Sequence, residues 1–309
     1  MKILVTGGSG FIGSHIVDSL LELGHRVKIY DIESPRHGQR CDFVKADVMD
    51  FRRLVKESEG HDAAYHIAAE ANVNRFFESP FYSNEITSCS TINVCEAARV
   101  AGLARVLLAS TEWVYGSDPS NPDVLITEET HMTDNPDHIY TSSKIAAELF
   151  IRNYRKMYGV NSTVMRFGIP FGERARPETV TPIFIRKIMS GEEITVHGDG
   201  SQTRQFIYVK DLARGCAACL HPRAENEVFN LNGRERVSVL DIIHNLEEIL
   251  GKKARVTFID QRAGQFKGRM ISSEKAKALL GWEPQFSYRE ALERYVRSYL
   301  AGLEEPVRA

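Results

Sequence analysis

The sequence predicts an α/β fold built on a doubly wound parallel sheet. Two observations predict it: a glycine-rich turn joins the first apolar strand to a helix, and strand-like apolar runs then alternate with helical patterns. Parallel strands need crossover connections, and the helices between the strands supply them. Ligands of such sheets bind beyond the carboxyl ends of the strands, so the residues that follow each strand are the candidates for function.

The first 31 residues form one strand–turn–helix–strand unit. A buried strand at 3–5 precedes three glycines at G-x-x-G-x-x-G spacing, and an apolar run at 27–30 ends in Asp31. Glycines permit a tight turn and let the backbone approach a pyrophosphate, whose charge the first N–H groups of the helix would meet. Asp31 is placed to accept hydrogen bonds from an adenosine ribose, which favours NAD over NADP. The predicted NAD contacts of this unit are Gly7, Gly10, Phe11, Ile12, Gly13 and Asp31.

Composition excludes several classes of function. The chain has 309 residues, of which 43% are hydrophobic and 26% charged, and its net charge is −2. Such a charge predicts no nucleic-acid or anionic-membrane partner, and no apolar run is long enough for a membrane span. The chain enters a core strand at once, so we expect no signal peptide and a cytoplasmic location.

The five cysteines do not indicate a metal or redox site. Cys216 and Cys219 form one C-x-x-C pair, but the pair lies in an apolar helical run and no second pair of ligands exists. Buried helix residues with free thiols are the better interpretation. We therefore predict no metal.

The alternation continues along the chain. Strands are predicted at 43–46, 63–67 and 105–109, and helices at 51–57, 80–101 and 139–158, the last two ending at Gly102 and Gly159. Further on, Ser238 and Ser287 have the spacing of helix caps, and they predict helices at 239–250 and 288–300. Trp282 is expected to anchor the core, and His66 to be a core or supporting residue rather than a catalytic one.

Tyr140 and Lys144 form the second candidate constellation. They stand four residues apart at the start of the helix 139–158, and therefore on one face of it. An ammonium close to a phenol stabilises the phenolate and lowers its pKa. Such a tyrosine can take a proton from a sugar hydroxyl. The alternative is an ordinary pair of side chains four residues apart at the start of a helix. Thr111, at the end of the preceding strand, favours the catalytic interpretation.

Taken together, these motifs resemble the extended short-chain dehydrogenase/reductases of the nucleotide-sugar epimerase/dehydratase family. The resemblance covers nearly the whole chain. It depends on Asp31, on Asp47 with Val48, and on the segments 6–13 (TGGSGFIG), 66–73 (HIAAEANV), 110–116 (STEWVYG), 140–144 (YTSSK), 166–172 (RFGIPFG), 204–213 (RQFIYVKDLA) and 262–282 (RAGQFKGRMISSEKAKALLGW).

The resemblance implies a tightly held NAD that oxidises a sugar hydroxyl, usually at C4, and later returns the hydride. Tyr140 would be the base, Lys144 would orient it and the nicotinamide ribose, and Thr111 would bind the sugar oxygen. The remaining implied contacts are Asp47, Val48, Ala68 and Ala69 to NAD, and Arg204 and Arg262 to the diphosphate of a nucleotide-diphosphate sugar.

The resemblance also implies an architecture. It predicts a Rossmann-type NAD-binding domain at 1–166, to which 203–232 return, and a smaller C-terminal substrate-binding lobe formed by 167–202 and 233–309. Relatives form a homodimer through the helices 80–101 and 139–158, so a homodimer is expected here as well.

Several departures from the family pattern leave the reaction open. Trp113 stands where dehydratases and decarboxylases usually carry an acid, but Glu112 occupies the position of a second acid in some 4,6-dehydratases. Ile169, Thr87 and Ser272 also replace usual family residues, and these changes affect the expected nucleotide and sugar. We predict C4 epimerisation. A 4,6-dehydratase or decarboxylase using Glu112 is the alternative, and a non-catalytic dinucleotide sensor is the remote one.

Overall fold

The structure is a computed structural model that describes residues 1–116, 124–260 and 268–304. A parallel sheet forms its centre, in the strand order β10-β6-β5-β4-β1-β2-β3. The doubly wound parallel sheet predicted from the sequence is therefore confirmed. Its strands are β1 (Lys2–Thr6), β2 (Arg26–Asp31), β3 (Asp42–Lys45), β4 (Ala63–His66), β5 (Arg105–Thr111), β6 (Ser162–Phe167) and β10 (Val228–Leu231).

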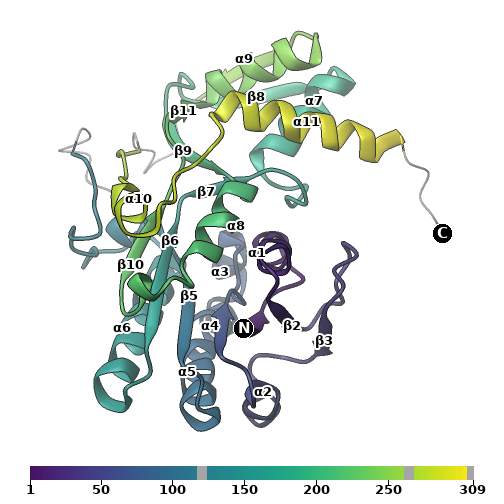
Figure 1. The fold of residues 1–309 in the computed structure, drawn as a ribbon. Coiled ribbons are helices and arrows are strands. Elements are labelled where there is room, and N and C mark those ends of the chain that lie inside the picture. Colours follow the sequence, from purple (N-terminus) through teal and green to yellow (C-terminus); the bar gives the residue numbers. More distant parts are fainter. Residues whose placement is uncertain (117–123, 261–267, 305–309) are drawn as a thin grey trace.

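Helices cover both faces of this sheet (Figure 1). Ile3 and Val5 of β1 pack in one apolar cluster with α1 and α8, whereas Leu4 packs in the opposite cluster with α2, α5 and α6. Successive side chains of a strand point to opposite faces, so a short apolar run fills both layers. The helices are α1 (Phe11–Glu22), α8 (Val209–Ala218) and α10 (Glu274–Leu280) on the first face, and α2 (Phe51–Ser58), α5 (Ser90–Ala101) and α6 (Ile139–Tyr158) on the second.

A second group of elements packs around an apolar cluster of its own. It lies beyond one end of the large sheet, at the top of Figure 1. Its strands form a three-stranded sheet, β11-β9-β7, and a two-stranded sheet, β12-β8. The elements are β7 (Ile169–Phe171), α7 (Val180–Ser190), β8 (Glu193–His197), β9 (Thr203–Tyr208), β11 (Arg236–Ser238), α9 (Val239–Leu250), β12 (Arg255–Ile259) and α11 (Tyr288–Glu304).

The region predicted as one helix at 80–101 is more complex. It consists of α4 (Pro80–Asn84), a π-helical segment (Glu85–Cys89) and α5, and the short helix α3 (Val73–Glu78) precedes it. The hydroxyls of Ser88, Ser90 and Thr91 donate to carbonyls four residues earlier. Such side-chain bonds compete with the backbone hydrogen bonds of an α-helix. They accompany the π-helical segment here. The predicted end at Gly102 is confirmed by its φ of 72°.

The remaining helix predictions are confirmed. Ser238 and Asp241 form a reciprocal capping box at the start of α9, and Gly251 ends that helix with a φ of 63°. Trp282 is buried in the core beside α8 and donates to the Asp211 carbonyl. All five cysteines are free thiols, and Cys216 and Cys219 are buried. Among the described residues, no helix combines the length and apolar character that crossing a bilayer requires.

Candidate active site

The glycine turn between β1 and α1 has no room for a side chain at Gly7 or Gly13. Gly7 has a φ of 73°, and a Cβ on it would lie 2.5 Å from the Ala68 nitrogen. A Cβ on Gly13 would lie 2.0 Å from the Gly7 carbonyl oxygen. Gly10 caps α1 with no side-chain hydrogen bond, so the first N–H groups of the helix are available to an anion. This cradle fits the pyrophosphate of a dinucleotide.

Asp31 is held beside that turn, at the carboxyl end of β2. Its Oδ2 accepts from the Ser9 amide at 2.9 Å, and its Oδ1 accepts from the Glu33 amide at 3.0 Å. After β3, Asp47 accepts from the Met49 amide at 2.9 Å, and Val48 packs into the core. The sheet therefore brings the acid expected for the ribose and the pair expected for adenine to one edge.

Tyr140, Thr111 and Lys144 meet where β5 ends and α6 begins. The Thr111 hydroxyl acts on the Tyr140 phenol and lowers its pKa. Lys144 stands one helical turn after Tyr140, is buried, and donates from Nζ to the Ala109 carbonyl at 3.0 Å. Thr111 is also buried, and the predicted site residues of the two elements are thus brought together.

The electrostatics of Tyr140 differ from the prediction. Burial raises its pKa to about 12, although the hydrogen bond from Thr111 and the charge of Arg176 lower it. We expected Lys144 to lower this pKa. Among the described residues, the groups that lower it are Thr111 and Arg176, and Lys144 is not one of them. Burial also lowers the pKa of Lys144 to about 8, against the opposing charge of Glu148.

An aromatic enclosure around Tyr140 was not foreseen. Phe76 of α3 and Trp113 meet the Tyr140 ring edge-on, with centroids 5.5 and 5.8 Å away. Trp113 also contacts the His138 ring at 5.7 Å. The sequence marks Trp113 only as a departure from the family pattern, and no local signal links Phe76 to a residue 64 positions later.

Glu112 follows Thr111 directly and is a candidate acid. Its Oε2 is buried without a hydrogen-bond partner among the described residues. Burial raises the pKa of this carboxyl to about 8, although the positive charge of Arg204 opposes the shift. A carboxyl that stays protonated near neutral pH can donate a proton or a hydrogen bond.

Of the two predicted diphosphate contacts, Arg204 comes from the second group of elements. Arg204 lies on β9, donates from Nη1 to the Thr203 carbonyl at 2.8 Å, and faces Glu112 electrostatically. Arg262 lies outside the described residues. Arg176, which sequence reasoning missed, donates to the Ala71 carbonyl at 3.2 Å and lowers the pKa of Tyr140.

The residues that depart from the family pattern, and His66, make defined contacts in the structure. Thr87 accepts from the Glu70 amide at 3.2 Å, Ile169 packs against the second apolar cluster, and Ser272 accepts from the Glu274 amide at 3.2 Å. His66 is buried between Thr6 and Ser90, with ring nitrogens 2.9 and 3.1 Å from their hydroxyls. Its expected role as a core or supporting residue agrees with these contacts.

Comparison with known proteins gives a consistent picture. The model of a family described as the NAD dependent epimerase/dehydratase family matches residues 3–231. A putative UDP-glucose 4-epimerase of Methanocaldococcus jannaschii is 33% identical over 304 residues, which cover 95% of this chain and 97% of the relative. A UDP-glucuronate 4-epimerase of Thermodesulfobacterium geofontis is 31% identical over 312 residues, or 95% and 94% of the two chains.

Solved structures agree. The crystal structure of UDP-glucose 4-epimerase from Thermotoga maritima with UDP-glucose is similar with a TM-score of 0.91 and 28% identity, over 98% of this chain and 100% of that one. Enzymes with other reactions also match, among them UDP-glucuronic acid decarboxylases and a dTDP-glucose 4,6-dehydratase solved with NAD.

Proposed function

Because this chain belongs to the NAD-dependent epimerase/dehydratase family, we propose that it is an NAD-dependent epimerase that inverts C4 of a UDP-sugar through a transient 4-keto sugar. The observation that carries the proposal is the meeting of three side chains at the carboxyl end of β5. Thr111 acts on the Tyr140 phenol, and Lys144, one turn after Tyr140, donates to the Ala109 carbonyl of the same strand. A phenol and a hydroxyl in contact are suited to receive the hydrogen of a sugar alcohol.

The residues around the glycine turn fit the cofactor. Gly7, Gly10 and Gly13 would hold the pyrophosphate, Asp31 the adenosine ribose, and the residues after β3 and β4 the adenine and nicotinamide halves. When bound, NAD supplies a hydride acceptor that can also give the hydride back. The carboxylate of Asp31 disfavours the extra phosphate of NADP by charge repulsion.

Each side chain of the constellation has a distinct proposed role. Tyr140 takes the proton of the sugar 4-hydroxyl and later returns it, and Thr111 holds the same oxygen by a hydrogen bond. Lys144 keeps a positive charge beside the nicotinamide ribose and the phenol. Arg204, with Arg262, binds the diphosphate, for which guanidinium geometry is suited.

A dehydratase or decarboxylase is the second candidate, and Glu112 favours it. Its buried oxygen, which has no hydrogen-bond partner in the described part of the chain, and its raised pKa suit an acid that protonates a departing hydroxyl. Trp113 occupies the position of the other expected carboxylate, so only half of the dehydratase pair is present. An epimerase does not need that pair, which is why we place epimerisation first.

Proton NMR of the purified protein with NAD and a panel of nucleotide sugars tests the proposal. The panel includes UDP-glucose, UDP-galactose, UDP-glucuronate and UDP-N-acetylglucosamine, with GDP, CDP and dTDP counterparts. A new anomeric signal at unchanged mass is the expected result. A product lighter by one water or one carbon dioxide would instead establish the second candidate, and NAD binding without turnover of any sugar would favour the sensor alternative.

We also propose a division into lobes and a homodimer. The separate apolar cluster of β7, β8, β9, α7, α9 and α11 supports a substrate lobe distinct from the large sheet. The return to that sheet was expected over 203–232. Because β9 (203–208) packs with the second group, we propose that the return begins at α8. Exposed apolar side chains on α5 and α6, namely Val100, Leu149, Met157 and Tyr158, support a contact between two copies. The cytoplasmic location expected from the sequence stays a prediction.

A further inference from the structure

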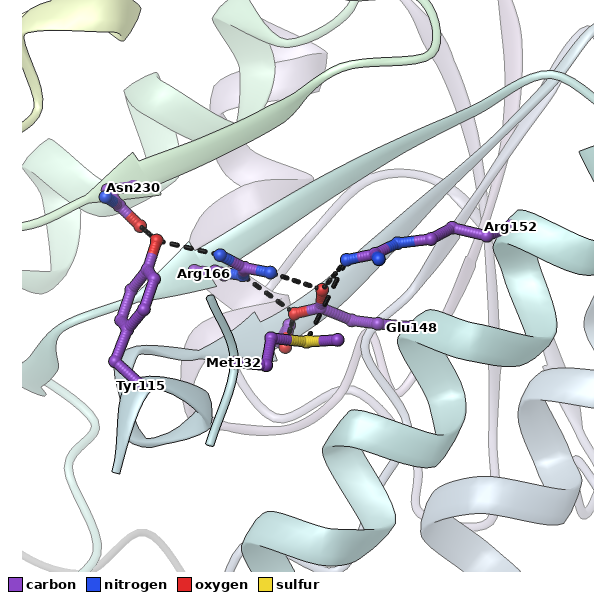
Figure 2. Close-up of polar contacts among 7 residues, drawn as sticks. Tyr115, Met132, Glu148, Arg152, Arg166 and Asn230 are labelled. Carbon is purple, nitrogen blue, oxygen red and sulfur yellow. Dashed lines mark hydrogen bonds and ion pairs between the residues drawn. The ribbon is translucent and has the colours of Figure 1, made fainter. Parts of the chain in front are cut away.

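A buried ion pair lies directly behind the candidate catalytic residues. Glu148 of α6 and Arg166 of β6 are 0% and 2% exposed. The Arg166 Nε donates to Glu148 Oε1 at 2.9 Å, and its Nη2 donates to Oε2 at 2.7 Å (Figure 2). This bidentate geometry fixes the carboxylate in position as well as in charge.

The same carboxylate joins α6 to the end of β5. Ser110, the residue before Thr111, donates from its hydroxyl to Glu148 Oε1 at 2.6 Å. One turn earlier on α6, Lys144 donates to the carbonyl of Ala109 at 3.0 Å. Two successive turns of the helix that carries Tyr140 therefore contact two successive residues of the strand that carries Thr111.

Glu148 also sets the charge around Lys144. Among the described residues, Glu148 on α6 raises the pKa of the Lys144 ammonium, and His66 on β4 faces that ammonium. Arg166 of β6 and Arg152 of α6 are paired with the same carboxylate. Burial lowers the pKa of His66 to about 3, so that ring is neutral. β5 contributes the Ala109 carbonyl, which accepts from Lys144, and the Ser110 hydroxyl, which donates to Glu148. Glu148 is thus a negative charge shared by Arg166, Arg152 and the buried Lys144, and its removal would leave three positive charges near one another.

We propose that Glu148 is a positioning residue: it holds Tyr140 and Lys144 in register with Thr111 and supplies the negative charge that keeps Lys144 protonated. Glu148 is fully buried, so this role requires no contact with the substrate or the cofactor. The proposal rests on the proposed function, because it takes the placement of Tyr140 and Lys144 beside Thr111 to serve catalysis. A purely structural Glu148 would change stability alone, whereas this role changes the titration of Lys144.

The primary test is Glu148→Gln, studied as NAD-saturated protein. Without the carboxylate, Lys144 loses its proton at lower pH. The decrease of the rate on the alkaline side of the pH–rate profile should therefore begin at a lower pH than in the wild type. Misplacement of reacting groups lowers kcat by about 10- to 100-fold, with KM for the sugar within about twofold. Glu148→Asp keeps the charge and is expected to restore the pH profile while kcat stays reduced. A wild-type kcat and pH profile in Glu148→Gln would overturn the proposal.

A second readout does not need turnover. The folded pKa of Lys144, about 8, lies below its ordinary value of 10.5, so stability relative to a Lys144→Met protein should rise as pH increases between these values. In the Glu148→Gln background this rise should begin at lower pH. If the wild type turns over no nucleotide sugar, the proposed function fails, but this comparison of melting temperatures still decides whether Glu148 sets the charge of Lys144.

Two further variants keep the test decisive. Arg152→Gln removes a half-exposed partner of the same carboxylate, whose Nη2 lies 3.2 Å from Glu148 Oε2, and should keep the wild-type profile. Glu148→Gln leaves Arg166 buried without a charge partner and so risks misfolding. In that event Ser110→Ala decides: a kcat about three- to tenfold lower at a near wild-type melting temperature supports the proposal. A wild-type kcat would overturn it.

Discussion

Tyr140 is the side chain whose loss should affect turnover most. Tyr140→Phe removes the hydroxyl and keeps the ring that Phe76 and Trp113 enclose. We expect kcat to fall by about 10²- to 10⁴-fold, the usual contribution of a positioned acid–base group, and NAD affinity to stay unchanged. Steady-state kinetics and a cofactor-binding titration check this together. Turnover near the wild-type rate would remove Tyr140 from the role of base.

Glu112 predicts a pH dependence of stability whose sign can be worked out. Its folded pKa, about 8, lies above its ordinary value of 4.5, so between these values the folded state binds a proton that the unfolded state has lost. Stability from this group is therefore present at low pH and decreases as pH rises to about 8. Glu112→Gln removes the titration, and its melting temperature relative to the wild type should increase from pH 5 to pH 9.

Turnover of the same variant separates the two candidate reactions. An epimerase should keep kcat within about tenfold in Glu112→Gln, whereas loss of a catalytic acid costs about 10²- to 10⁴-fold. Thermal melts in a series of buffers and the NMR assay measure both effects. An unchanged melting difference across the pH range would show that Glu112 is ionised in the folded protein.

Sequence reasoning at this scale can nominate site residues where a local pattern marks them. Gly7, Asp31 and the pair Tyr140–Lys144 were identified from spacing within one turn or one strand. The contact of Glu148 with Arg166 joins residues 18 apart on different elements, and the approach of Phe76 to Tyr140 spans 64 positions. Such contacts depend on tertiary packing, which a single sequence does not display.

At the scale of elements, the glycine turn makes the sharpest prediction. Gly13→Ala would place a Cβ 2.0 Å from the Gly7 carbonyl, so α1 must move away from the turn. We expect NAD affinity to fall at least about tenfold, equivalent to ~1.4 kcal/mol, together with a lower melting temperature. Gly302→Ala on α11 is the matched control, because its Cβ would meet no atom within 4 Å. Cofactor titration by calorimetry measures the difference, and equal affinities in the two variants would contradict it.

Element boundaries were predictable where a single residue ends or begins an element. Gly102, Gly159 and Gly251 end helices in the left-handed conformation, as their positions in the sequence predicted. The π-helical segment at Glu85–Cys89 was not predictable. It lies within an unbroken helical pattern, and the hydroxyl bonds that accompany it involve residues with ordinary helical spacing.

At the scale of the whole molecule, the parallel sheet followed from the alternation of strands and helices. The arrangement of the second group of elements did not, because its short strands β7, β9 and β11 come from three separate stretches of the chain. Its Arg204 nevertheless faces Glu112 from β9. The diphosphate contact proposed for this arginine therefore depends on how the two groups pack, which the resemblance to a family could suggest and composition could not.

The proposed homodimer can be tested by placing charges on the exposed apolar surface of α6. Leu149 and Met157 lie on α6 with 46% and 67% of their surface exposed, and apolar exposure on a long helix is costly unless a partner covers it. Charged residues at the centre of a two-fold interface repel their own copies, so Leu149→Glu combined with Met157→Glu should convert a dimer into a monomer. Light scattering coupled to gel filtration measures the mass. Leu23→Glu, at the end of α1 and 63% exposed, adds a similar charge away from α5 and α6 and should remain dimeric. A monomeric wild type, or a double variant that stays dimeric, would place the interface elsewhere or remove it.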